Sequence, residues 1–474
     1  MQIKITNLFK LKEESWSSTA YSSKNDLLVA VDRAGYVYCF NLQQNQLVWR
    51  KKLGPMITAS PILEDVNGDG NEEILIGVEQ TGRFLCLDIE GNILWERVCG
   101  SSIRSNAQTF YSEKLNATCV IVAGYGNHMF CLDGKTGQVL WKTFLGKHIF
   151  SGALGVVSSP LIADVDGDGK NEIVIGSRHR MVVCLDSESG KIKWNYMIYS
   201  DPDSSPSIAW IDKTPYIFVG GGEFTNGLGD LSVHAINGIT GKRIWKKKLN
   251  GGLDSCPVVR DIDNDGNLEV VITSLADFSC YALDAITGEV KWKTPFNKTH
   301  ECIGNNEICF TKEKYFTEDA ICRSYTTPLI FEDNKGVSKI LVGSNNGQIM
   351  MLNGFNGNII ESNNTNGMVR ASFIGIAKNK ESYVLAISGK NIIKINLPDV
   401  KSVMRNQFST SDNSFNILPP KVFNTRNLKF KTFLKFYFHL LIVDFFRWGF
   451  NVLDLRFKFP IKLLVKNRKH NINL

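Results

Sequence analysis

The stretch Ala282-Leu-Asp-Ala-Ile-Thr-Gly-Glu-Val-Lys-Trp292 decides the fold, because the chain repeats it six more times. The other copies span Cys39–Trp49, Cys86–Trp95, Cys131–Trp141, Cys184–Trp194, Ala235–Trp245 and Met351–Glu361, the last without its Trp. The Trp residues follow one another at intervals of 46, 46, 53, 51 and 47 residues. Periods of this size, made of short alternating strands and Gly turns, are typical of a β-propeller with four strands per blade. The Asp/Asn-x-x-Thr-Gly core predicts a hairpin turn in which Gly adopts a positive φ, and Trp is the large residue expected to pack one blade on the next.

Strand counting favours an all-β propeller of eight four-stranded blades, with seven blades as the alternative. Seven full periods run from about Ser15 to Glu361, and three further strands are expected at 369–377, 383–387 and 391–396. The missing fourth strand is expected at the other end of the chain, where Gln2–Phe9 alternates as a strand should. Pairing the first strand with the last would close the ring and remove exposed edges.

Three acidic loops interrupt the repeats at spacings of 99 and 97 residues. Each has a carboxylate or amide at positions 1, 3, 5 and 9 and Gly at position 6, an oxygen-rich pattern that suits a hard cation such as calcium. An apolar strand follows where an EF-hand would begin a helix. The predicted metal ligands are Asp65, Asn67, Asp69 and Glu73; Asp164, Asp166, Asp168 and Glu172; and Asp261, Asp263, Asp265 and Glu269.

With these motifs in hand, the chain resembles two families of propellers. The Leu-Asp-x-x-Thr-Gly-x-x-x-Trp repeat is similar to the PQQ-like (quinoprotein-type) propeller repeat, and the acidic loops resemble the calcium loops of FG-GAP propellers such as integrin α heads. The resemblance implies the fold and up to three structural calcium ions. PQQ itself is not expected, because the chain lacks the adjacent cysteines and the Cys-x-x-Cys-His site of quinoprotein dehydrogenases. The fold alone does not assign a function.

The chain divides into a propeller at 1–400, a linker at 401–420 and a tail at 421–474. The tail holds twelve Lys or Arg residues against two Asp, whereas the whole chain has a formal net charge of +7. Basic residues mixed with Phe, Trp and Leu suit an amphipathic segment, expected to be helical, at an anionic membrane surface. Packing of the tail on the propeller or on a partner is the alternative, and nucleic acid is not expected.

Composition and motifs favour a cytoplasmic protein, either free or peripheral on the inner face of a membrane, because no secretory signal is apparent. The Cys at the start of four repeats exchanges with Ala, which indicates buried packing and not disulfide chemistry. The insertion with Cys302, Cys309 and Cys322 has no standard zinc spacing, and its role stays open.

The expected function is a non-catalytic, calcium-stabilised scaffold. A protein partner is expected on the face that carries the long loops Gly220–Asp230 and Asn297–Ser324. Two alternatives stay open: an enzyme with its site on the propeller axis, either quinoprotein-like or carbohydrate-active, and an adhesion-type or receptor-type head.

Overall fold

The computed structural model describes residues 3–146, 155–222, 229–275, 277, 279–296, 326–370, 372–378, 381–397 and 400–403. The chain forms two compact units, and the first, Met1–Gly146 with Leu154–Pro420, is the one described below. The second unit, Lys147–Ala153 with Lys421–Leu474, lies outside the described residues, as do the predictions for the basic tail and for the Cys302 insertion. The described part contains no helix that could cross a membrane.

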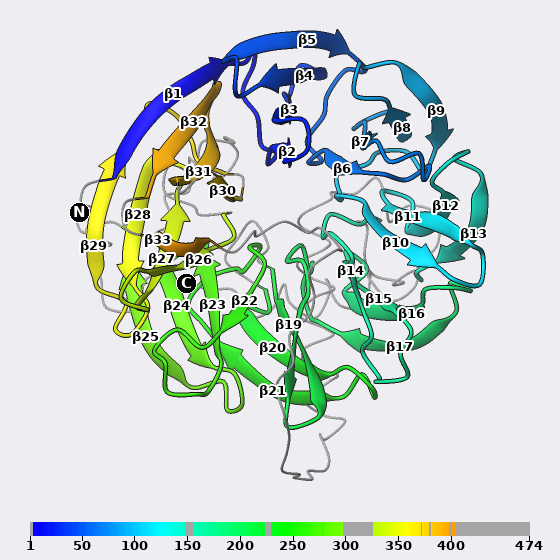
Figure 1. The fold of residues 1–474 in the computed structure, drawn as a ribbon. Helices are drawn as coiled ribbons and strands as arrows, with labels where there is room; N and C mark the ends of the chain where they lie inside the picture. The colour runs from blue at the N-terminus through cyan, green and yellow to red at the C-terminus, as the bar shows by residue number, and fades with distance from the viewer. Residues whose placement is uncertain are drawn as a thin grey trace, which may run out of the picture. The chain divides into compact units, whose positions relative to one another are not determined.

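Eight antiparallel sheets form a ring of blades, which confirms the predicted propeller (Figure 1). Blade 1 contains β2 (Ala20–Ser22), β3 (Leu27–Val31), β4 (Tyr36–Asn41) and β5 (Gln46–Lys52). Blade 2 contains β6 (Ile62–Glu64), β7 (Glu73–Gly77), β8 (Arg83–Leu87) and β9 (Ile93–Val98). Blade 3 contains β10 (Gln108–Ser112), β11 (Ala117–Ala123), β12 (His128–Asp133) and β13 (Val139–Phe144). Blade 4 contains β14 (Leu161–Ala163), β15 (Glu172–Ser177), β16 (Met181–Asp186) and β17 (Ile192–Met197).

The second half of the ring repeats this order. Blade 5 contains β18 (Ser207–Ile211), β19 (Thr214–Gly220), β20 (Ser232–Asn237) and β21 (Arg243–Lys248). Blade 6 contains β22 (Val258–Arg260), β23 (Glu269–Ser274), β24 (Ser279–Asp284) and β25 (Val290–Pro295). Blade 7 contains β26 (Leu329–Asp333), β27 (Ser338–Gly343), β28 (Gln348–Asn353) and β29 (Ile359–Asn364). We call the four strands of each blade A to D in chain order, from the innermost outward.

Blade 8 is closed by the two ends of the propeller sequence, as predicted. It contains β30 (Ile374–Lys378), β31 (Glu381–Ser388) and β32 (Asn391–Asn396) as strands A to C, and β1 (Lys4–Lys10) as strand D. β1 pairs with β32 in antiparallel register, from Lys4 opposite Asn396 to Lys10 opposite Asn391. Blade 8 also contacts blade 1, because Phe9 of β1 stacks on Phe40 of β4 with ring centroids 4.1 Å apart.

One strand was not expected from the sequence. β33 (Val400–Val403) pairs with β26 at the inner edge of blade 7 and gives that blade a fifth strand. No repeat motif marks these residues, because β33 lies outside the four-strand pattern. Residues 400–403 form a strand because β26 has an edge that its own blade leaves unpaired.

The hydrophobic core lies between neighbouring blades. One cluster joins Phe331 and Ile349 of blade 7 to Val384 and Ile393 of blade 8, and it includes Ile3 beside the closing strand. The Cys residues at the start of the repeats belong to this kind of packing. Cys39, Cys86, Cys131 and Cys184 are free thiols with no exposed surface, as the sequence predicted.

The tryptophans join the blades in the way the motif predicted. Trp194 Nε1 donates a hydrogen bond of 2.6 Å to the carbonyl oxygen of Gly238, which lies in the C–D turn of the next blade. The indole also packs on the glycine that ends that turn, since a Cβ atom on Gly241 would lie 2.8 Å from the Trp194 ring. Gly241 has φ +65°, so the motif needs glycine both for the turn and for the space. The same donor contact recurs from Trp49, Trp95, Trp141, Trp245 and Trp292.

Candidate metal centre

The three acidic loops are the A–B turns of blades 2, 4 and 6. Strands alternate in direction within each antiparallel blade, so the A–B and C–D turns lie at one face of the ring and the B–C and D–A connections at the other. The acidic loops therefore share a face with the hairpin turns that receive the tryptophans. The long loops favoured as a binding surface belong to the opposite face, and much of them, residues 223–228 and 297–325, lies outside the described residues.

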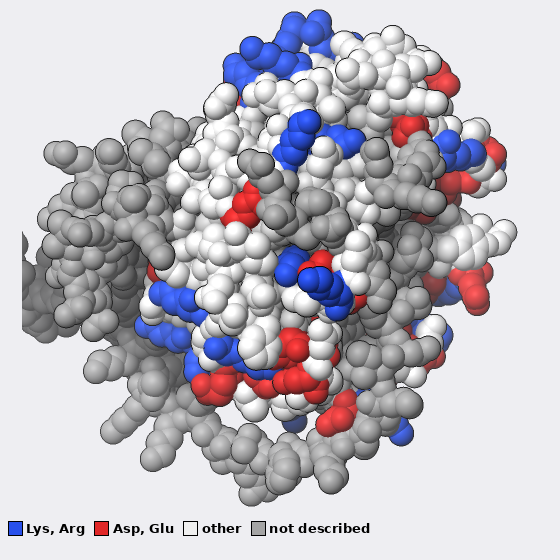
Figure 2. All heavy atoms as spheres, turned by 60° about the vertical axis from the view of Figure 1, so that its left-hand side comes forward, with Lys and Arg blue, Asp and Glu red and all other residues white. Residues whose placement is uncertain are grey.

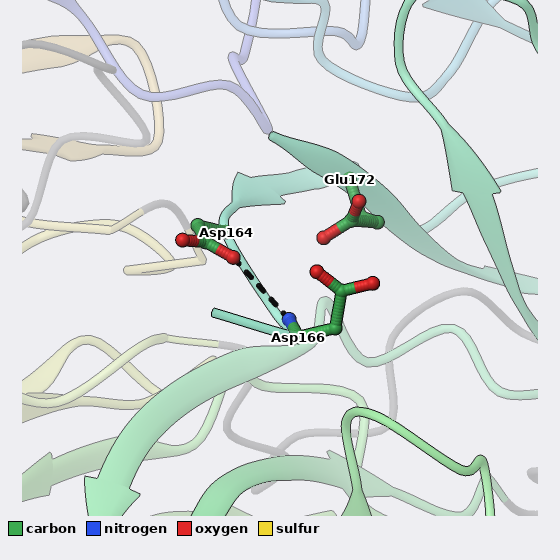
Figure 3. Close-up of side chains that lie close together, drawn as sticks. All are labelled: Asp164, Asp166 and Glu172. Carbon is green, nitrogen blue, oxygen red and sulfur yellow. Dashed lines mark hydrogen bonds between the residues drawn. The ribbon is translucent and has the colours of Figure 1, made fainter. Parts of the chain in front are cut away.

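In blade 4 the first aspartate organises the loop. Asp164 Oδ1 accepts a hydrogen bond from Gly167 N at 2.6 Å, and its Oδ2 accepts one from Gly169 N at 2.9 Å. The chain is thereby bent so that the carboxylates of Asp166 and Glu172 face one another (Figure 3). One carboxylate oxygen from each of these three residues lies within 4.8 Å of the others.

The last carboxylate of the loop is buried and ties the loop to strand B. Glu172 is 1% exposed, and its Oε2 accepts a hydrogen bond of 2.9 Å from Val165 N. Burial raises its pKa, and hydrogen bonds from Lys193 and from the Val165 backbone act in the opposite direction. Glu73 and Glu269 make the equivalent bonds to Val66 N and Ile262 N, at 3.0 and 2.9 Å.

The same backbone segments join each acidic loop to the following blade. The side chains of Val66, Val165 and Ile262 are buried, and their carbonyl oxygens approach Gly134, Gly238 and Gly354 of the next blade. A Cβ atom on those glycines would lie 2.5, 3.0 and 2.6 Å from these oxygens. The tryptophans of blades 2, 4 and 6 donate to the same three glycines. In blades 2, 4 and 6 the acidic loop and the repeat Trp therefore both contact the same glycine of the next blade.

A lysine enters the loops of blades 4 and 6. Lys193 of β17 places its Nζ 2.5 Å from Asp166 Oδ2 and 2.8 Å from Glu172 Oε1. Lys291 of β25 lies 2.7 Å from Asp263, 3.2 Å from Asp265 and 2.7 Å from Glu269. Burial disfavours the charged ammonium of each lysine, but hydrogen bonds to the carboxylates outweigh it and raise both pKa values above the ordinary range.

Blade 2 fills the same position with an amide. Asn67 Nδ2 donates to Glu73 Oε1 at 2.7 Å and to Asp69 Oδ2 at 3.1 Å. The residue of β9 equivalent to the lysine is Leu94, which is 48% exposed. Burial raises the pKa of Glu73 to about 7. Among the described residues, this loop does not gather three carboxylates as the other two do.

The structure brings only some of the predicted ligands together in each loop. The structure brings together Asp164, Asp166 and Glu172 in blade 4 and Asp261, Asp263 and Asp265 in blade 6. Asp168 is not in its loop's group, and its Oδ1 accepts a hydrogen bond from Lys170 N at 2.8 Å. The oxygens are of the type that calcium binds. In blades 4 and 6 a lysine ammonium already contacts two of the three grouped carboxylates.

The sequence contains the signal for these lysines, although it was not used to predict them. The residue before the repeat Trp is Lys only in the copies of blades 4 and 6, at Lys193 and Lys291. In a strand, residues alternate between faces, so a residue next to the Trp lies on the other side of the sheet. Its meeting with an A–B turn depends on the twist and pairing of the folded blade.

A buried polar network occupies a second place, at the junction of blades 4 and 5. His234 of β20 donates from Nε2 to Asp230 Oδ1 at 2.9 Å, and its Nδ1 accepts from the hydroxyl of Tyr196 at 2.9 Å. Lys246 Nζ contacts the other oxygen of Asp230 at 2.8 Å. Burial lowers the pKa of His234, which favours the neutral ring. Burial opposes ionisation of Asp230, but hydrogen bonds from His234 and Lys246 outweigh it and hold the Asp230 pKa well below its usual value.

Comparison with known proteins agrees with this architecture. A family model described as outer membrane protein assembly factor BamB matches residues 33–222 and 215–418. Among the curated proteins, none matches this sequence significantly.

Several solved structures share the fold. BamB from Moraxella catarrhalis superposes with a TM-score of 0.58 at 18% identity, over 83% of this chain and 99% of its own. Sqt1 of Saccharomyces cerevisiae has a TM-score of 0.57 at 10% identity, over 82% and 98%. A europium-containing methanol dehydrogenase has a TM-score of 0.56 at 10% identity, over 82% and 85%. At these identities the likeness shows the fold alone.

Proposed function

This chain belongs to the family described as outer membrane protein assembly factor BamB, and from that premise we propose that it is a scaffold that binds a protein partner. The proposal is carried by a row of apolar side chains on the face of the acidic loops. Ile239, Ile286 and Phe355 occupy the same position of the C–D turn in blades 5, 6 and 7, and they are 49%, 43% and 67% exposed. Single exposed apolar residues are ordinary, whereas a contiguous apolar patch marks a protein-binding surface, and we propose that these three side chains act together as such a patch.

One side of the propeller carries charge of both signs. Seen from the side that lies at the left of Figure 1, separate groups of Lys and Arg and of Asp and Glu lie on a surface that is otherwise drawn white (Figure 2). Mixed charge of this kind is compatible with the polar rim of a protein interface.

The long-loop face remains the second proposed surface. Long loops on a rigid ring are common binding sites, and Gly220–Asp230 supports the proposal by its length. The two surfaces lie at opposite faces of the ring, so one experiment can separate them.

The test begins with native full-length protein, whose partner is identified by cross-linking and mass spectrometry. Affinity for that partner is then measured for the paired variant Ile286→Asp/Phe355→Asp and for a variant with residues 223–228 replaced by Gly-Ser. Val98→Asp is the matched control, because Val98 of β9 is 67% exposed, as Phe355 is. Loss of affinity in the paired variant alone supports the apolar row; loss in the loop variant alone moves the site to the long-loop face; and equal affinity in all variants contradicts both.

We also propose that the acidic loops bind calcium as a structural ion. Support comes from the carboxylates of blades 4 and 6, which converge within 4.8 Å. A cation that binds only the folded state stabilises it, by about 2.7 kcal/mol at a hundredfold excess over Kd. The melting temperature should fall when EGTA removes calcium, and Asp164→Ala/Asp261→Ala should reduce that response.

Attachment to an anionic membrane through residues 421–474 is the last part of the proposal. Its support is the composition of the segment, with twelve basic residues among Phe, Trp and Leu. The full chain should sediment with anionic liposomes in a salt-sensitive way, and a chain ending at Pro420 should not. Equal binding by both chains would contradict the proposal.

A further inference from the structure

We infer that Lys193 and Lys291 are the built-in cations of the acidic loops in blades 4 and 6. Each lysine holds its loop closed without a metal, and a divalent cation can bind there only by displacing it. The second half of this inference rests on the proposed calcium binding. The first half does not.

The contacts of Lys291 show why an ammonium can replace a metal here. Its Nζ donates to carboxylates at three positions of the loop, Asp263, Asp265 and Glu269, at distances of 2.7 to 3.2 Å. Glu269 has no exposed surface, and a buried carboxylate without a partner is strongly destabilising. Beside the hydrogen bond from Ile262 N, the lysine supplies a cationic partner from strand D of the same blade, with its own charge still partly in contact with solvent.

Blade 2 provides an internal comparison. Where strand D has Leu94 and no lysine, position 3 of the loop is Asn67 and not Asp. The Asn67 amide donates to the same two positions, 5 and 9, that Lys291 contacts in blade 6. The lysine and the additional carboxylate are lost together, so positions 1, 3, 5 and 9 with the strand-D residue carry the same formal charge in all three blades. The lysine thus offsets the additional carboxylate of blades 4 and 6, and in each blade these acidic side chains still outnumber the basic ones.

Three further blades extend the comparison. Blades 1, 3 and 5 have no acidic loop, and the residue before the repeat Trp is Val48, Leu140 or Ile244. A lysine in this position is therefore not part of the general repeat. It occurs in both blades whose loop has Asp at position 3.

A divalent ion and the ammonium would compete for the same oxygens. Lys193 Nζ contacts Asp166 and Glu172, two of the three carboxylates that converge in blade 4. Removing the lysine should therefore have two separate effects. In the absence of metal the loop loses the ion pairs that hold it closed, and its affinity for metal rises.

The experiment compares full-length wild type with Lys193→Met and Lys291→Met. Methionine keeps most of the aliphatic stem, and Lys193→Arg keeps the charge. Lys191→Met is the matched control, because Lys191 lies two residues before Lys193 at an exposed position and its replacement removes the same charge. Melting temperature is measured in EGTA and across a calcium titration, with magnesium as a second probe.

We expect both methionine variants to melt below wild type and below Lys191→Met in EGTA, with Lys193→Arg close to wild type. Calcium should then raise their melting temperature more than that of wild type, with apparent affinity at least about tenfold tighter, a factor that corresponds to 1.4 kcal/mol. A lower melting temperature in EGTA without calcium rescue supports the lysine staple and overturns calcium binding at these loops. Lysine variants that melt like Lys191→Met in EGTA overturn the inference itself.

Discussion

Glu361 Oε1 accepts a hydrogen bond of 2.5 Å from the backbone N–H of Ile3, 358 residues away in the sequence. Glu361 lies at the position of the repeat Trp in blade 7. In the earlier blades that Trp donates to a carbonyl in the C–D turn of the next blade. Blade 8 has no such turn, because its strands C and D come from opposite ends of the propeller sequence. The start of β1 offers an N–H donor in its place, so the chain uses an acceptor where the repeat uses a donor.

Replacing Glu361 should weaken ring closure. We expect Glu361→Ala to lower the free energy of unfolding by about 1.5–3 kcal/mol, the usual range for a hydrogen bond to a charged group. Glu361→Gln, which keeps an acceptor oxygen, should lose less. Urea unfolding measures the difference, and Glu90→Ala, at an exposed position of a C–D turn, is the control. A Glu361→Ala variant as stable as this control would show that the contact does not contribute.

The glycines shared by acidic loop and tryptophan should tolerate no side chain. A Cβ atom at position 354 would lie 2.6 Å from Ile262 O, so Gly354→Ala should cost about 1–3 kcal/mol, as overpacking does. Ser187→Ala is the control, because Ser187 holds the equivalent place in blade 4 and accepts from Trp141 of blade 3, a blade that has no acidic loop. Thermal or urea unfolding of both variants gives the comparison. Equal stability would mean that the turn moves freely away from Ile262.

The association of a strand-D lysine with Asp at position 3 can be tested by building both into blade 2. We expect Asn67→Asp to destabilise the protein, because it adds a carboxylate beside Asp69 and Glu73 and removes the amide donor. Adding Leu94→Lys should recover stability, since the double variant copies the arrangement of blade 6. A double-mutant cycle measured by urea unfolding at low ionic strength gives the coupling free energy. A coupling near zero would show that residues 67 and 94 do not act together.

Acid should destabilise the junction of blades 4 and 5 through His234. The buried ring has a pKa below its value in the unfolded chain, so below about pH 6.5 the unfolded state binds the extra proton more readily. The contribution of His234 to stability is therefore present above pH 6.5 and declines as the pH falls below it. Asp230, whose pKa is lowered, adds its own loss only below about pH 3.9.

The measurement is the free energy of unfolding of wild type and His234→Gln between pH 7.5 and 5. Wild type should lose stability over this range more steeply than the variant. His128→Gln is the control, because His128 of β12 lies against Phe130 and Phe144, outside this network. Parallel pH profiles for wild type and His234→Gln would contradict the prediction.

The sequence alone determined the architecture, because its signals are local and repeated. The turn Asp-x-x-Thr-Gly and the following Trp specify a hairpin and its contact with the next blade, whatever else the chain does. Counting the copies then gave seven blades and the three strands of an eighth. The alternation in Gln2–Phe9 identified the strand that completes it.

The three acidic loops could be recognised in the same way, since position 1 of each loop bends its own backbone within five residues. What fills the loops depends on tertiary structure. Lys193 is 27 residues from Asp166, and only the pairing of strands B, C and D brings its ammonium to the A–B turn. The same holds for Glu361 and Ile3, which the curvature of the ring brings together. Local hydrogen bonds can be predicted from sequence patterns. Contacts between strands depend on twist and register, which only the folded ring fixes.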